Sequence, residues 1–483
     1  MTKKLFAVLL AIATMVCLVV PASASVDLSK HTYEAYQIFT GTVNEDGQLE
    51  DIQWADGYNS TELLKALGLD ENSTVAAAAK AIADMSDTNA QAFAATAYNC
   101  KGTVSAVTGT GSITFTSAGY YVIYDTTDVS AKVDAKNLTL LKVVNADEAV
   151  TPQVKTDVPS FEKKVKDTND STGETTDWQD SADYDIGDTI PYKLTATLGD
   201  ISKFDHYYLE FNDTMTHLTL VEGSVQVKID GENGIDITNS STVTWDAASK
   251  KLTVSINDVK VLGATSNSQV VVLYNATLDS DAVIGSVGNP NTADLTFSNN
   301  PNNTGNGESK PTDTGKTPED KNIVFTYKVH VDKTDEKNQP LKGAGFTLYK
   351  KDSATGNYVA VGSEVKGTEM TSFEWVGVDD GDYKLEETTV PTGFKKMDDI
   401  EFTVTATHTE LSNDPTLDNL TGGDKFTGEV STGELSATVI NKSGATLPST
   451  GGIGTTIFYV VGGVLMAGAF VLLITKKRMN HDA

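Results

Sequence analysis

The C-terminal end holds the feature that most restricts how this chain can fold. Residues 453–475 form an apolar run without a charged side chain, and Lys476, Lys477 and Arg478 follow it directly. As a helix, a run of this length spans roughly 35 Å, enough to cross a bilayer. Basic residues stay on the inner side of a membrane. The pattern therefore predicts a C-terminal transmembrane helix with the bulk of the chain outside the cell.

The N-terminal end predicts export. Lys3 and Lys4 precede an uncharged apolar run from Leu5 to Val20, and the run ends in small residues up to Ala24. This order of a basic, an apolar and a small-residue region is typical of a secretory signal peptide, so we expect residues 1–24 to be removed. A membrane anchor is the alternative, but the run is short for one and the cleavage site contradicts it.

Between the folded part and the apolar run stands a pentapeptide made of Leu447, Pro448, Ser449, Thr450 and Gly451. A plain transmembrane anchor explains the helix and its basic end but not these five residues. Together, residues 447–483 resemble the sortase sorting signal of Gram-positive wall proteins. The resemblance implies that a sortase cysteine attacks the Thr450 carbonyl, releases Gly451 onward and passes the acyl group to an amine.

The amino-acid composition is consistent with an extracellular protein. The chain has 66 acidic and 37 basic residues, a formal charge of −29, which argues against nucleic acid as a partner. Once the signal peptide is removed, Cys100 is the remaining cysteine, so no disulfide can form within the chain. We expect Cys100 to be a buried small hydrophobe. An extracellular protein without disulfides needs another source of durability.

From residue 100 onward, short runs rich in β-branched and aromatic residues alternate with Asn, Gly, Asp and Ser clusters. This is typical of antiparallel β-sandwiches. Residues 74–98 differ, because they are rich in Ala and lack Gly and Pro, so we expect one or two helices there with a break near residues 86–88.

The sequence thus predicts a mainly β protein of tandem immunoglobulin-like sandwiches. Connecting segments rich in Pro and polar residues divide the chain into three expected domains. These are residues 25–152, a mixed β domain with a helical insertion, residues 153–327, a middle sandwich, and residues 328–446, a C-terminal sandwich. The polar stretch 299–322 reads as a long loop near the end of the middle domain or as a linker between domains.

Three polar residues of the last domain are expected in its core. Lys333 shares a strand face with Val329 and Val331, and Asn441 shares one with Val439. Glu387 lies between these strands in the sequence. Buried polar groups are costly unless they pair, so an interaction among the three is expected.

Residues 341–346 and 383–394 resemble the B-type repeat domain of the collagen adhesin, including the pilin "E box", with Val390 and Phe394 as conservative departures. In that family a core Lys and Asn join as an intramolecular isopeptide bond, assisted by an acid. The resemblance implies a Lys333–Asn441 bond with Glu387 as helper. An ordinary buried Lys333–Glu387 salt bridge is the alternative.

The middle domain shows a second such set. Alternation with Phe161 and Val165 selects Lys163 as the inward lysine, Asp213 shares a face with Phe211, and Asn299 shares one with Phe297. Residues 178–188 and 297–301 resemble the middle, A-type domain of backbone pilins. We therefore expect a Lys163–Asn299 bond assisted by Asp213, with plain core burial as the alternative. The first domain offers no comparable set.

Backbone pilins carry an acceptor lysine where the first and middle domains meet, and Lys155 stands at that place, although the residues before it depart from the family motif. The resemblance implies that Thr450 of one subunit is joined to Lys155 of the next. If Lys155 is not the acceptor, Lys142 and Lys164 are next.

The sequence therefore predicts the backbone subunit of a covalent pilus fixed to peptidoglycan, with pilin-specific and housekeeping sortases and neighbouring subunits as partners. A monomeric wall-anchored adhesin is the first alternative, and a wall-anchored hydrolase the second. The scattered histidines indicate no metal site, and no cofactor or turnover enzyme motif is found. The host ligand is not specified by the sequence.

Overall fold

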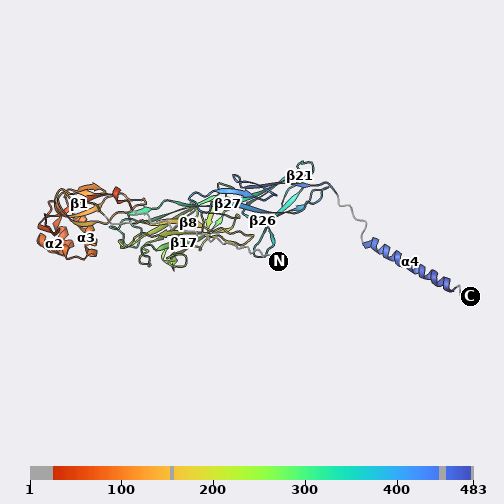
Figure 1. The fold of residues 1–483 in the computed structure, drawn as a ribbon, viewed down its shortest axis with the longest axis horizontal. Coiled ribbons are helices and arrows are strands. Elements are labelled where there is room, and N and C mark those ends of the chain that lie inside the picture. The colour runs from red at the N-terminus through yellow and green to blue at the C-terminus, as the bar shows by residue number, and fades with distance from the viewer. Residues whose placement is uncertain (1–25, 153–156, 445–452, 480–483) are drawn as a thin grey trace, which may run out of the picture.

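The computed structural model describes residues 26–152, 157–444 and 453–479. Within them the chain is mainly β, in three consecutive groups of sheets, followed by one long apolar helix (Figure 1). This confirms the fold class predicted from the sequence. The signal peptide, Lys155 and the pentapeptide 447–451 lie outside the described residues. The domain limits given above stay predictions.

The first group packs helices against an antiparallel sheet of order β2-β1-β5-β6, with β3 paired to β1 and a separate β4–β7 pair. Its elements are η1 (Leu28–Lys30), β1 (Thr32–Val43), β2 (Leu49–Trp54), α1 (Ser60–Ala66), α2 (Val75–Ala83), α3 (Asp87–Asn99), β3 (Val107–Thr110), β4 (Ile113–Thr114), β5 (Gly119–Asp125), β6 (Leu140–Val144) and β7 (Ala149–Val150).

The two expected helices are present, and they separate where the sequence indicated. Ser86 caps α3 by accepting a hydrogen bond from the backbone NH of Asn89, which satisfies one of the free donors of the first turn. The sequence did not predict α1. Cys100 is buried in the core between the helices and the sheet, as expected.

The middle group is a sandwich of two sheets, of orders β14-β13-β17-β10-β8 and β15-β16-β11-β18-β20-β9, with β12 paired to β17 and β19 to β18. Its elements are β8 (Ser160–Val165), β9 (Ser181–Asp183), β10 (Thr189–Thr197), β11 (Leu209–Met215), β12 (Leu218–Leu220), β13 (Gln226–Ile229), β14 (Ile235–Asp236), η2 (Thr238–Ser240), β15 (Thr242–Asp246), β16 (Lys251–Ile256), β17 (Gln269–Leu278), β18 (Asn289–Ser298), β19 (Thr314–Lys316) and β20 (Asp320–Phe325).

The C-terminal group is a second sandwich, with sheets of order β25-β21-β30-β29 and β23-β22-β26-β27-β28, and β24 paired to β22. Its elements are β21 (Tyr327–Asp335), β22 (Gly345–Lys351), β23 (Tyr358–Ala360), β24 (Val365–Lys366), β25 (Ser372–Val378), β26 (Gly381–Thr389), β27 (Ile400–His408), β28 (Leu417–Thr421), β29 (Thr427–Glu429) and β30 (Glu434–Asn441). Its first and last strands, β21 and β30, are neighbours and run parallel.

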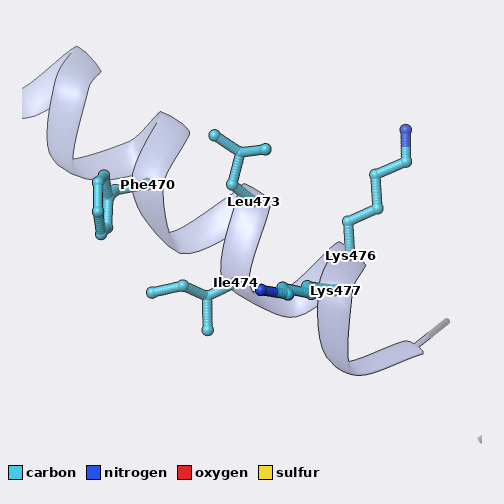
Figure 2. A pocket seen from close by; sticks show the side chains of 5 residues that line it. All are labelled: Phe470, Leu473, Ile474, Lys476 and Lys477. Atoms are coloured by element: carbon cyan, nitrogen blue, oxygen red, sulfur yellow. The ribbon is translucent and has the colours of Figure 1, made fainter. Parts of the chain in front are cut away.

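The last element is α4 (Ile453–Met479), which confirms the predicted C-terminal helix. Residues Ile457–Lys477 have a mean hydropathy of 2.5 and are long enough to cross a membrane. Figure 2 shows the end of this span, where the apolar Phe470, Leu473 and Ile474 give way to Lys476 and Lys477. The apolar side chains are exposed here, which fits a segment whose solvent is lipid.

Candidate functional site

The core of the middle sandwich holds a lysine, an acid, a tyrosine and an asparagine in one hydrogen-bonded group. Lys163 Nζ donates to Asp213 Oδ2 and, at 2.8 Å, to the hydroxyl of Tyr274. The same hydroxyl donates to Asp213 Oδ2 at 2.8 Å and accepts from Asn291 Nδ2 at 2.9 Å. Lys163, Asp213 and Asn291 are completely buried, and Tyr274 nearly so.

Strand register explains why these residues meet. Lys163 on β8 and Tyr274 on β17 come from one sheet, where both flank β10. Asp213 on β11 lies opposite Ala293 on β18, and Asn291 is the next inward residue of that strand. The group therefore spans the sandwich, since the lysine comes from one sheet and the acid and amide come from the other.

Burial makes this lysine a stronger nucleophile than a surface lysine. Desolvation lowers the pKa of Lys163, although the Asp213 carboxylate opposes this effect. A neutral amine has a free electron pair with which to attack a carbonyl carbon. Two buried oxygens, Asp213 Oδ1 and Asn291 Oδ1, have no hydrogen-bond partner in the described part of the chain.

Asn299 is not part of this group, so the structure does not bring the expected Lys163–Asn299 pair together. Its Nδ2 donates to the backbone oxygens of Val129 at 2.7 Å and Asp134 at 3.1 Å, both in the first group of elements. Asn299 follows the end of β18, eight residues beyond Asn291, and at ~3.3 Å per residue this moves it some 26 Å along the strand direction. It joins the first group to the middle sandwich instead.

The inward face of β18 was predicted correctly, and on that face Asn291, not Asn299, lies in the group with Lys163. Asn291, Leu295, Phe297 and Asn299 all obey the same alternation and are buried. Alternation identifies a face and cannot choose among the residues on it, because that choice depends on the pairing of β18 with β11. Tyr274 was also missed. Its alternation with Val272 and Ala276 on β17 marks it as inward, but nothing in the sequence connects it to Lys163.

The C-terminal sandwich brings Lys333, Glu387 and Asn441 together in its core, and each is 1% exposed. Asn441 Nδ2 donates to Glu387 Oε1 at 2.7 Å, and the backbone NH of Met397 donates to Glu387 Oε2 at 2.9 Å. Both carboxyl oxygens thus have partners, while Asn441 Oδ1 is buried without one.

Lys333 differs from Lys163 in its partners. Its Nζ donates to the backbone oxygens of Thr334 at 2.8 Å and Val439 at 3.3 Å. The hydrogen bonds of the amine therefore go to the backbone, and those of the acid go to the amide and to Met397. Burial lowers the pKa of Lys333, opposed by the charges of Glu387 and Asp335. The set is consistent with a neutral amine beside an amide held by an acid.

Lys142 and Lys164, the lysines expected to accept the Thr450 acyl group if Lys155 does not, both lie in described segments. Lys142 Nζ is 3.3 Å from Glu148 Oε1, and its side chain is 42% exposed. Lys164 Nζ is 2.7 Å from Asp180 Oδ1 and 3.3 Å from Glu162 Oε1, and its side chain is only 14% exposed. Lys142 is therefore the more accessible of the two.

Two parts of the chain match known families. Residues 327–416 match the SpaA family, a prealbumin-like fold domain, and residues 440–481 match the LPXTG cell wall anchor motif. The trypsin-resistant surface T6 protein of Streptococcus pyogenes serotype M6 is 27% identical over 394 residues, covering 68% of this chain and 70% of that protein.

The fold is shared with a solved structure. The T6 backbone pilin of serotype M6 Streptococcus pyogenes, with a modular three-domain structure, has a TM-score of 0.51 at 18% identity, covering 86% of this chain and 97% of that one. The full-length major pilin SpaD from Corynebacterium diphtheriae has a TM-score of 0.44 at 18% identity, covering 86% and 93%. The chain thus resembles the Gram-positive backbone pilins in sequence and in fold.

This chain is a cell-wall-anchored surface protein. Its anchor motif spans residues 440–481 and includes the apolar helix α4. Such a motif makes the chain a sortase substrate, as the pentapeptide indicated. The matched proteins are a surface protein and backbone pilins, and the chain shares their fold.

Proposed function

We propose that this chain is the backbone subunit of a covalently polymerised pilus, and that each of its two sandwiches is closed by an internal Lys–Asn isopeptide bond. The observation that supports this is the burial of a lysine, an acid and an asparagine together in two consecutive sandwiches, just before the wall anchor. In the C-terminal sandwich the bond joins Lys333 to Asn441 with Glu387 assisting. In the middle sandwich it joins Lys163 to Asn291 with Asp213 assisting.

The chemistry of each bond balances without a cofactor. The neutral amine of the lysine attacks the amide carbon of the asparagine, a C–N bond forms, and the C–N bond to the old amide nitrogen breaks. The lysine gives up a proton and the leaving group departs as ammonia. A protonated acid stabilises the oxyanion of the intermediate by donating to it. Each site reacts once, so the role of the chain is structural and not that of an enzyme in turnover.

Tyr274 is a positioning residue in the middle site. Its hydroxyl holds both Lys163 Nζ and Asn291 Nδ2 at hydrogen-bond distance, so it brings amine and amide together before reaction. The C-terminal site has a different arrangement, since there Glu387 itself accepts from Asn441.

Polymerisation would use the C-terminal Thr450 of one processed subunit and Lys155, between the first and middle domains, of the next. A pilin-specific sortase would pass the Thr450 acyl group to Lys155 of the next subunit, and a housekeeping sortase would pass the last one to peptidoglycan. A monomeric wall-anchored adhesin is the second candidate, because the same anchor and sandwiches would serve it. The two differ in whether a lysine of one subunit accepts the Thr450 of another.

An immunoblot of muramidase-released wall extract, boiled in detergent, tests polymerisation. We expect a high-mass ladder from the native strain and monomer alone from a Lys155→Ala strain, with Lys142→Ala as matched control. A single band in the native strain would establish the monomeric adhesin instead. A ladder that survives Lys155→Ala keeps the pilus and moves the acceptor elsewhere, with Lys142 examined first.

A further inference from the structure

A second group of chemically reactive side chains lies where the middle and C-terminal sandwiches meet. It consists of Asp167, just after β8, Asp183, at the end of β9, and His408, at the end of β27. His408 Nε2 lies 3.4 Å from Asp167 Oδ2 and 3.9 Å from Asp183 Oδ1. One ligand atom from each of the three lies within 4.8 Å of the others.

The hydrogen bonds of Ser181 fix the tautomer of His408. The Ser181 hydroxyl donates its proton to the backbone oxygen of Thr409 at 2.7 Å, since a carbonyl oxygen can only accept. The same hydroxyl lies 2.7 Å from His408 Nδ1, so Nδ1 must be the donor in that contact. In a neutral ring the free electron pair is then on Nε2, the nitrogen that faces the two carboxylates.

The carboxylates are left with unused acceptors. Asp183 is 2% exposed, and its Oδ2 has no hydrogen-bond partner among the described residues; the same holds for Asp167 Oδ1. The Tyr327 hydroxyl also faces the Asp183 carboxyl. The two oxygens without a partner, Asp183 Oδ2 and Asp167 Oδ1, thus belong to the carboxylates whose other oxygens lie nearest His408 Nε2.

We propose that Asp167, Asp183 and His408 form a binding site for a divalent cation of the zinc type, bridging the middle and C-terminal sandwiches. One imidazole and two carboxylates make a mixed nitrogen and oxygen ligand set that suits zinc, whereas calcium takes six to eight oxygens. Ligands ~2.0–2.2 Å from a tetrahedral zinc are about 3.4 Å apart, close to the observed separations from Nε2. Ser181 orients the imidazole from behind.

Two other acidic groups in the described chain show why this one stands out. Asp170, Asp185 and Asp379 surround Lys350 Nζ, which already supplies the positive charge. His330 uses both ring nitrogens, at 2.9 Å from Glu374 Oε1 and 3.3 Å from Asp332 Oδ1, and these carboxylates are about half exposed. Sequence patterns did not predict a metal site, because its residues come from segments far apart in the chain.

The site makes a specific prediction for zinc binding to the processed chain, residues 25–450, measured by calorimetry and elemental analysis. We expect one zinc per chain, lost in both His408→Gln and Asp183→Asn and retained in His330→Gln, which removes a histidine from a similar acidic group. Ser181→Ala should weaken zinc affinity about 10–100-fold, as expected for a residue that orients a ligand.

A measurement on the unmutated chain guards against misfolded variants. Cobalt(II) bound to such a site should give the visible absorption bands of a four-coordinate ion, and zinc should abolish them. Absence of a single equivalent of zinc, absence of the cobalt bands, or equal binding by wild type and His408→Gln would each overturn the proposal. None of these results bears on pilus assembly, because neither the sorting signal nor the two lysine sites use these residues.

Discussion

Lys333 and Asn441 lie on the adjacent parallel strands β21 and β30, with Asn441 two residues beyond Val439, the residue that pairs with Lys333. Partners in a parallel ladder point to the same face, so amine and amide both enter the core of the C-terminal sandwich. The two side chains therefore meet at the end of the ladder, next to the acid from β26.

Replacing Asn441 with Ala should remove one internal bond. The unmutated processed chain should weigh less than its calculated mass by two ammonia molecules, and the variant by one. A cross-link that closes about 100 residues stabilises by about 4–5 kcal/mol in the chain-entropy account, so the C-terminal sandwich should also unfold at a clearly lower temperature. Intact-mass spectrometry and calorimetry measure both effects. A full calculated mass for the unmutated chain would exclude both bonds.

The choice between Asn291 and Asn299 can be decided by two variants compared side by side. The measured mass of Asn291→Ala should fall short of its calculated mass by one ammonia instead of two. The reason is that the Asn291 amide lies with Lys163 on the Tyr274 hydroxyl in the unmutated chain. Asn299→Ala should keep both mass losses and instead loosen the junction with Val129 and Asp134. Peptide mapping after trypsin would show which asparagine is linked, and a Lys163–Asn299 peptide would contradict the assignment.

The Tyr274→Phe variant tests whether the Tyr274 hydroxyl positions the amine and the amide, separately from the assistance that Asp213 gives to bond formation. The variant keeps the ring and the Lys163–Asp213 pair but loses the hydroxyl that holds amine and amide. We expect the middle bond to form slowly, so that freshly purified protein is a mixture of masses that converges with time. Asp213→Ala should show no bond formation at all. Equal and complete reaction of Tyr274→Phe would show that the hydroxyl is dispensable.

The first group of elements should be more stable in mild acid than in mild base. His31 is buried, with Nδ1 2.7 Å from Asp125 Oδ2 and Nε2 3.1 Å from Asp134 Oδ1. Burial acts to lower the pKa of His31, but the two carboxylates outweigh it and the pKa is raised. A raised pKa in the folded state gives stability that is complete below the unfolded value near 6.5 and is lost as the pH rises through the folded value.

Amide hydrogen exchange in β1 checks this prediction. It is measured at one pH below the unfolded pKa of His31 and at one pH above its raised folded pKa, and it is corrected for intrinsic exchange rates. Protection should fall at the higher pH in the unmutated chain. His31→Gln should flatten the dependence, while His206→Gln, which changes a histidine of the middle sandwich, should not. A flat profile in the unmutated chain would contradict the role of His31.

The sequence predicted the inward faces of the strands well and the contacts between strands less well. Lys163, Lys333 and Asn441 follow from alternation with apolar residues on a buried face, whereas Glu387 was inferred from the resemblance to the E box. Asn291 and the junction group of Asp167, Asp183 and His408 depend on register and on packing between sandwiches. Both are set by contacts distant in the sequence, which local patterns do not encode.

Because β21 opens the C-terminal sandwich and β30 closes it, their parallel pairing also decides how that sandwich bears a load. Tension applied along the chain pulls the start of β21 and the end of β30 in opposite directions. The ladder from Lys328 opposite Glu434 to Asp335 opposite Asn441 is then sheared, with all of its hydrogen bonds resisting at once. An antiparallel hairpin in the same place would open one bond at a time. The order of strands thus lets the C-terminal sandwich resist tension directed toward the wall anchor that follows it.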